Sequence, residues 1–367
     1  MIETQTLHKD YLLPLLRKLG KQYRLVGPVR NRFGDTLYIE IPDLDRVDID
    51  LKQQPQNSLK SFFFPQTEAL SSYIVDTEPA SPTQLYSFHP LLPENRPTLY
   101  FGVRSCDLFA VLYMDMIFLG GKHRDIYYEQ RRRGAVFVTL GCNEPFANCF
   151  CNATKNGPFL EFGFDLQLTD LGPAKNSYFV EAGKANGLNI LKKWTRFFTD
   201  ATKEDRQFQY QAALEARGLF RQLVHVDLAC QELEKGNEPE EVLADFSQRC
   251  QDCGGCTFIC PTCTCFSITD HQAKDQGSGE RIRSWDGCTF AGFTRMAGDH
   301  NPIDLRRHRI RKRFFHKLKH DVQKHGRPSC VGCGRCVDMC FGGVDIIRFI
   351  NAITEAGDLG RDKHRGL

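Results

Sequence analysis

Two cysteine runs with the same spacing constrain the fold of this chain more than any other feature. Each run reads CxxCxxCxxxC, the first over residues 250–260 and the second over residues 330–340. Three thiolates at every third residue can bind three corners of a 4Fe–4S cubane, while the fourth cysteine, on the helix that follows, reaches the other cluster. The spacing therefore predicts one cluster bound by Cys250, Cys253, Cys256 and Cys340, and a second bound by Cys330, Cys333, Cys336 and Cys260.

Zinc is the competing interpretation of these runs. Structural zinc sites usually pair two CxxC units and do not need three consecutive triplet spacings, so the runs favour a two-cluster, ferredoxin-like domain. Phe341 stands where a proline is expected after Cys340, which predicts an altered local turn and not the loss of a cluster. The two runs lie 80 residues apart, which predicts a large insertion between them.

A second group of cysteines lies upstream, in loops that follow or adjoin expected strands. Loops at strand ends commonly gather into one site, and four thiols within 46 residues, two of them in a CxC pair, favour a third 4Fe–4S cluster. These thiols are Cys106, Cys142, Cys149 and Cys151. The alternative is that each is a small buried hydrophobe. Asp107 could replace one thiol as a ligand, or it could cap the helix that follows it.

Three further cysteines, Cys263, Cys265 and Cys288, leave three interpretations open. They could supplement the upstream four, form a separate site with a non-cysteine ligand, or pack beside the second cluster. Cys230 lies on an amphipathic helix and is expected in the core.

The first part of the chain, residues 1–202, is expected to be an α/β domain. Apolar, β-branched or aromatic runs predict strands, and an apolar stretch is long enough for a buried helix, with Cys106 in the turn before it. The strands are expected at 36–41, 98–103, 135–140 and 178–181, and the helix at 108–119.

The rest of the chain is expected to be mainly helical. Residues 203–249 predict a linker of two helices broken at 236–239, followed over 250–354 by a helical, ferredoxin-like dicluster domain with a basic insertion. Within it, residues 268–279 are polar and glycine-containing like a surface loop. Residues 355–367 are expected to form a polar tail.

Length and composition limit the kind of protein that this chain can be. The 367 residues allow two or three domains, and no stretch approaches the roughly 18 apolar residues of a membrane span. The first residues lack the charge order of a secretory signal, so we expect a cytoplasmic location. Because that compartment is reducing, the 16 cysteines do not indicate a disulfide framework.

A basic run at residues 306–319 holds eight Lys and Arg residues and no acid. We interpret it first as electrostatic support for the clusters or for docking an acidic partner, second as a solvated helix face, and last as a nucleic-acid surface. Phe314 and Phe315 are expected on the buried side of its helix.

The sequence also lacks the motifs of a catalytic subunit. It contains no GxGxxG after a strand, no Walker A motif, no flavin or nicotinamide fingerprint and no Ser, His and Asp set. We therefore predict a chain that carries electrons and has no catalytic residues of its own.

Motifs along most of the chain resemble a known family. They are FGVRSCDLFAV, DIYYEQRRR, CNEPFANCFC, CPTCTCF, SWDGCTFAGFTRMAGDHN, RHRIRKRFFHK and CVGCGRCVDMC, and the resemblance extends from residue 61 to residue 340. The chain resembles the iron–sulfur beta subunit of cytoplasmic, sulfhydrogenase-type nickel–iron hydrogenases, a family that also includes the corresponding subunit of anaerobic sulfite reductase.

The resemblance implies a heteromeric complex. It implies a diaphorase subunit that binds FAD and NAD(P), and this chain as the relay to the small and large hydrogenase subunits that hold nickel and iron. In the alternative, the partner is a sirohaem sulfite reductase subunit. A zinc-binding nucleic-acid module is a distant alternative, and we expect neither a nucleic-acid partner nor a membrane span. The two cysteine runs match the family's cluster ligands, and the upstream four match its motifs.

Overall fold

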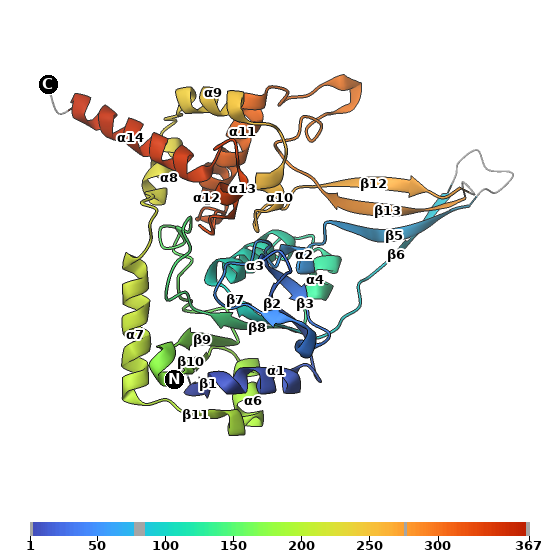
Figure 1. Cartoon of the computed structure of the whole chain (residues 1–367). Helices are drawn as coiled ribbons and strands as arrows, with labels where there is room; N and C mark the ends of the chain where they lie inside the picture. Colours follow the sequence, from blue (N-terminus) through green and yellow to red (C-terminus); the bar gives the residue numbers. More distant parts are fainter. Residues whose placement is uncertain (1–2, 77–84, 275–276, 365–367) are drawn as a thin grey trace.

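A computed structural model describes residues 3–76, 85–274 and 277–364, and Figure 1 shows its arrangement. Within these residues, nine strands form a sheet in the first part of the chain, in the order β11-β1-β10-β9-β8-β7-β2-β3, with β4 also paired to β2. Four central strands are parallel: β2 (Arg24–Arg30), β7 (Thr98–Val103), β8 (Ala135–Leu140) and β9 (Leu166–Asp170). The flanking strands are antiparallel: β1 (Glu3–His8), β3 (Thr36–Glu40), β4 (Asp48–Ile49), β10 (Ser177–Ala182) and β11 (Phe198–Asp200).

The central strands form because their residues are apolar and are covered on both faces. Every residue of β7 is buried, as is typical of parallel strands between two layers. One apolar core includes residues of α1 (Leu12–Leu19) and α6 (Ala185–Lys193), and the other includes residues of α2 (Lys60–Phe63), α3 (Ser105–Phe118) and α4 (Ile126–Arg132). The predicted α/β architecture and its four strands are confirmed. The helix begins earlier than predicted, so Cys106 lies in its first turn and not in a preceding loop.

Three helices, and not the predicted two, follow this domain. They are α7 (Lys203–Gly218), α8 (Val226–Glu234) and α9 (Glu240–Arg249). A capping box between Thr202 and Asp205 begins α7. The extra break lies at 219–225, where Leu219 and Leu223 remain exposed. Helices in proteins depend on packing of their apolar face, so apolar spacing alone could not extend α7 through this segment.

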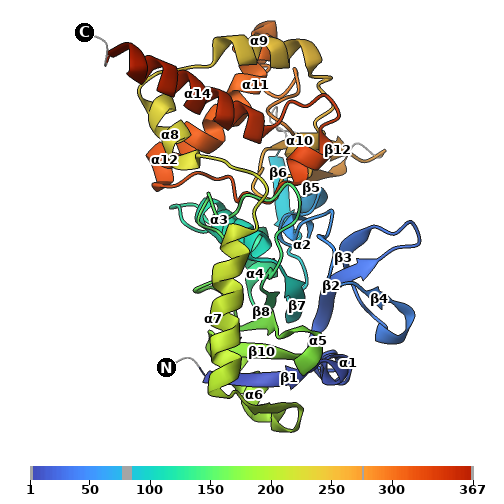
Figure 2. The same cartoon turned by 60° about the vertical axis from the view of Figure 1, so that its left-hand side comes forward.

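The last part of the chain packs short helices around a third apolar core (Figures 1 and 2). Its helices are α10 (Gly255–Phe258), α11 (Arg306–Phe315), α12 (Asp321–His325), α13 (Arg335–Met339) and α14 (Ile346–His364). A π-helical turn at His316–His320 joins α11 to α12. Helix α14 continues to His364, so most of the segment expected to be a polar tail is helical. Shorter elements are α5 (Gly172–Lys175) and single turns at Lys9–Tyr11, Leu44–Arg46, Thr195–Phe197 and Ala297–Asp299.

A separate four-stranded sheet joins segments that are far apart in the sequence. It has the order β12-β13-β5-β6 and contains β5 (Thr67–Asp76), β6 (Leu85–Pro90), β12 (Phe266–Gln272) and β13 (Ser278–Trp285). It extends away from the rest of the molecule in Figure 1. The prediction of a surface loop at 268–279 is therefore wrong for residues 268–272 and 278–279, which lie in β12 and β13. Residues 273, 274 and 277 lie between the two strands, and residues 275–276 lie outside the described residues. The polar residues of β12 belong to an exposed edge strand, where no apolar alternation is needed.

Candidate iron–sulfur sites

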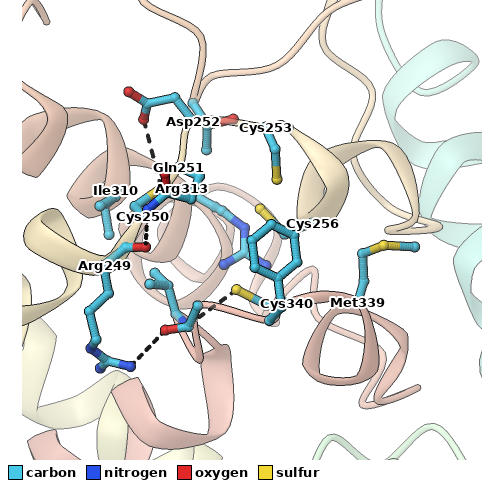
Figure 3. Close-up of a pocket in the computed structure, with 15 residues that line it drawn as sticks. Arg249, Cys250, Gln251, Asp252, Cys253, Cys256, Ile310, Arg313, Met339 and Cys340 are labelled. Atoms are coloured by element: carbon cyan, nitrogen blue, oxygen red, sulfur yellow. Dashed lines mark hydrogen bonds between the residues drawn. The ribbon is translucent and has the colours of Figure 1, made fainter.

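The first thiol group, Cys250, Cys253, Cys256 and Cys340, surrounds one pocket with about 520 Å³ of empty space, part of it open to solvent. Cys250 directly follows α9, Cys256 lies in α10 and Cys340 follows α13. Figure 3 shows the sulfur atoms of Cys253, Cys256 and Cys340 facing a common space. These are the four thiols that the spacing assigned to one cluster, and their ligation of that cluster stays a prediction.

This first group lies at the molecular surface. Cys253 is exposed, and two large apolar side chains at the pocket rim, Met339 and Phe341, are 45% and 82% exposed. The residue that replaces the expected proline therefore stands almost fully in solvent beside the most accessible thiol.

Arg313 supplies a positive charge behind the first group (Figure 3). It is buried, and none of its three guanidinium nitrogens has a hydrogen-bond partner in the described residues. Burial alone would lower the pKa of Arg313, but the surrounding thiols, Cys256 and Cys336 foremost, raise it. A buried charge without a partner is unfavourable. The residues present therefore fit an anionic group such as a thiolate-ligated cluster.

The basic run has one buried cationic face, of which Arg313 and Lys317 act on nearby thiols. Arg309, Arg313 and Lys317 are spaced four residues apart and all three are buried, as residues on one side of a helix are. The Arg309 Nη2 donates to Asp252 Oδ2 at 3.1 Å, and the Lys317 Nζ donates to Thr262 Oγ1 at 3.0 Å. This placement supports the interpretation of the run as electrostatic support for clusters.

The aromatic pair of the basic run lies in the core. Phe314 and Phe315 are both buried, and Phe314 stacks on Phe349 of α14 with ring centroids 4.4 Å apart. The prediction that they form the buried side of the helix is confirmed.

The second thiol group brings Cys260 to the second cysteine run. Burial raises the pKa of Cys330 to about 12 and also raises those of Cys333 and Cys336, and repulsion from Cys260 adds to the rise in all three. Electrostatic coupling of this kind requires proximity. The crossed arrangement predicted from spacing, with the fourth cysteine of one run beside the other run, is consistent with these contacts.

The third thiol group forms in the α/β domain. Cys106, Cys142, Cys149 and Cys151 line one narrow pocket. The Arg104 Nη1 lies 3.7 Å from the Cys142 Sγ. The four upstream cysteines thus converge at the ends of β7 and β8, as their positions in the sequence predicted.

The third group contacts the second through hydrogen bonds between their loops. The Cys149 thiol donates to the Cys333 carbonyl at 3.5 Å, and the Gln54 side-chain amide donates to the same carbonyl at 2.8 Å. The Phe150 amide donates to the Gly332 carbonyl at 2.8 Å. The α/β domain and the dicluster region therefore meet at these two sets of thiols.

Asp107 neither caps the helix nor lines the third pocket. Its carboxylate forms a buried, bidentate ion pair with Arg335 at 2.7 and 2.9 Å, and accepts from the Tyr38 hydroxyl at 3.1 Å. The predicted cap is wrong because this carboxylate is directed to Arg335, and no side chain caps the start of α3. This ion pair links α3 to the second cysteine run.

Sequence reasoning missed the residues that hold the thiol groups together. Arg335 lies inside the second cysteine run, but its partner is 228 residues away. Gln54 carries no motif. A sequence signal exists only for Arg309, Arg313 and Lys317, which follow one another at i, i+4 spacing within the basic run.

The remaining cysteines divide between two environments. Cys230 on α8 is half-buried against the third apolar core, and burial raises its pKa to about 12. Cys263, Cys265 and Cys288 lie near the second group, where Cys263 contacts Cys260. The structure therefore places Cys230 apart from the three thiol groups and the other three cysteines beside them.

The comparisons with known proteins agree with this geometry. Residues 249–344 match the model of the 4Fe–4S dicluster domain, so the chain is an iron–sulfur protein with a domain of the type that holds two such clusters. It is 27% identical over 350 residues to Sulfhydrogenase 2 subunit beta of Pyrococcus furiosus, covering 95% of this chain and 98% of that protein. The chain is a homologue of that subunit. No helix in the described part of the chain is long and apolar enough to span a membrane.

Proposed function

We propose that this chain is the electron-transfer subunit of a multi-subunit oxidoreductase. In this proposal it relays electrons between a subunit that binds FAD and NAD(P) and a nickel–iron hydrogenase module. The likeness to a sulfhydrogenase beta subunit supports the kind of complex, and the dicluster domain supports the kind of cofactor. We assign no catalytic residue to the chain.

The observation that carries the proposal is the continuous series of thiol groups. The third group opens toward a wide pocket at the carboxyl ends of the parallel strands, which Cys142 also lines. The second group follows at Cys333. Arg313 lies close enough to Cys336 of the second group and to Cys256 of the first for both thiols to act on its charge. The series ends at exposed Cys253.

Clusters bound at these groups would supply one-electron carriers whose potentials depend on net charge, hydrogen bonds to sulfur and solvent exposure. We propose 4Fe–4S clusters at the first two groups, with the ligands assigned above, and a third at Cys106, Cys142, Cys149 and Cys151. The residues of the chain then act by position and charge. They hold the thiols in place and exclude water from the second and third groups. They also place cations near the thiols.

Replacing Cys253 with Ala in the purified complex tests the proposal. Because Cys253 is the exposed member of the terminal group, we expect electron transfer between NAD(P)H and the hydrogenase module to be lost. Hydrogen-dependent dye reduction at the catalytic subunit should be retained. Both activities should be retained in Cys230→Ala, which changes a cysteine outside the thiol groups.

Two results would contradict the relay. One is full NAD(P)-linked activity in Cys253→Ala, and the other is loss of both activities in a complex that remains assembled. Assembly is checked by size-exclusion chromatography with subunit quantitation.

A further inference from the structure

Three cysteines outside the three thiol groups meet at the base of the β12–β13 hairpin. Cys265 directly precedes β12 and Cys288 closely follows β13. Phe266 pairs with Trp285 across the two strands, and the Asp286 amide donates to the Cys265 carbonyl at 3.0 Å. The hairpin thereby holds Cys265 beside Cys288, and each thiol acts on the pKa of the other.

Cys263 lies two residues before Cys265, on the turn that leads from the second thiol group. Its amide donates to the Cys260 carbonyl at 3.4 Å, and its thiol and the Cys260 thiol act on each other's pKa. Because the Lys60 Nζ reaches both the Cys263 carbonyl and the Trp285 ring, Cys263 lies in the same region as the base of the hairpin, next to the second group.

Two buried lysines surround this site. Lys60 and Lys317 are 2% and 4% exposed. The Lys60 Nζ donates to the carbonyls of Thr257, Phe258 and Cys263 at 3.5, 3.0 and 3.3 Å and lies 3.8 Å from the centre of the Trp285 ring. In the part of the chain that the structure describes, neither ammonium forms an ion pair with a carboxylate. Buried charges are normally paired, and the neighbouring thiols would supply the counter-charge once they are deprotonated.

The second group alone does not account for Lys60. Burial lowers the pKa of Lys60 to about 8, and the thiols that oppose this effect are Cys263, Cys260 and Cys265. Two of these three belong to none of the assigned groups. Lys60 also comes from α2, on the α/β side of the molecule, so this part of the chain directs a cation toward the extra cysteines. The site thus contains thiols and positive charge in the same combination as the first two groups.

We propose that Cys263, Cys265 and Cys288 bind a fourth iron–sulfur cluster through three thiolates, with Lys60 and Lys317 as its counter-charges. Each thiol gives up its proton when it binds iron. Three thiolates serve three irons, so a three-iron cluster, or a cubane with one iron lacking a cysteine, matches the donor set. The contact between Cys263 and Cys260 places this cluster next to the second one. The inference does not depend on which subunits surround the chain.

Iron and acid-labile sulfide analysis of the full-length chain, purified anaerobically, tests the site. Cys288→Ala should lose about three or four irons per chain and a similar amount of sulfide. The electron paramagnetic resonance signals of the reduced ferredoxin-type clusters should remain. Cys230→Ala should lose no iron, and Cys253→Ala should lose iron from the first group. Wild-type iron in Cys288→Ala, with reduced iron in Cys253→Ala, would overturn the fourth cluster and leave the dicluster assignment standing.

If Cys288→Ala does not fold, a labelling experiment on the wild-type chain tests the fourth cluster instead. The native chain is alkylated under anaerobic conditions before and after chelation of its iron, and each cysteine is quantified by mass spectrometry. Cys263 and Cys265 are only half-buried, so we expect protection before chelation and labelling after it. Labelling of both in the iron-loaded chain at the rate of half-buried Cys230 would overturn the proposal.

Discussion

Arg313 shows how a single residue connects the basic run to the chemistry of the thiols. Its guanidinium is buried without a hydrogen-bond partner in the described residues, and the thiols nearest to it come from both cysteine runs. Arginine stays protonated under all ordinary conditions. It therefore supplies a permanent positive charge that interacts with thiols of both the first and the second group.

Replacing Arg313 with Met should lower the reduction potentials of the first two clusters. A nearby cation stabilises the more negative, reduced state, and a unit charge about 8 Å away at an effective dielectric of about 20 shifts a one-electron potential by roughly 50 to 100 mV. Redox titration followed by electron paramagnetic resonance measures the shift.

The matched control is Arg307→Met, which removes a half-exposed arginine of the same helix that pairs with Glu240 at 3.4 Å. The reduction potentials should change little in this control because solvent screens the charge of Arg307. Unchanged potentials in Arg313→Met, with both clusters intact, would contradict the electrostatic role of the buried face.

At the scale of elements, the contact between the second and third thiol groups depends on two glycines. Gly332 and Gly334 have φ angles of +66° and +77°. A β-carbon on Gly332 would lie 2.6 Å from the Cys151 nitrogen, and one on Gly334 would lie 2.4 Å from the Asn148 carbonyl oxygen. Only glycine allows the loop at 148–151 to approach the second run so closely.

Gly332→Ala should therefore separate these loops. We expect loss of iron from the third group and a decrease in the free energy of unfolding larger than the roughly 1 to 2 kcal/mol that a left-handed alanine costs by itself. Gly326→Ala isolates that cost, because Gly326 has a φ of +71° with no atom within 4 Å of its β-carbon position. Iron analysis and thermal unfolding distinguish the two variants. Equal effects of both would show that the close approach is not important.

The sequence predicted some of the elements that burial makes regular, such as the apolar run of β7, but it missed the mostly buried central strands β2 and β9. The regular spacing of the cysteine runs predicted the four thiols that line the first pocket, and the position of the upstream cysteines in loops at strand ends predicted those that line the third. Strand β12 was missed because an exposed edge strand carries no apolar alternation. The ion pair of Asp107 with Arg335 was missed because its partners are far apart in sequence and neither lies in a pattern that indicates burial.

At the scale of the whole molecule, the second and third thiol groups lie where the two parts of the chain meet. Figure 2 shows α7 running alongside the large sheet toward the helical region, with the dicluster helices beyond it. The third group belongs to the α/β part, and the first group includes the exposed Cys253. Such an arrangement offers two separate places for exchange of electrons, one at the pocket beside Cys142 and one at Cys253.

Metal and haem analysis of the native complex, isolated anaerobically through a tag on this chain, tests the central claim most directly. The cofactor of the partner identifies the reaction that the relay serves. The proposed function predicts about one nickel per complex, with iron and sulfide in excess and bound flavin. Sirohaem without nickel would contradict the hydrogenase assignment and would place the same thiol groups in a sulfite reductase.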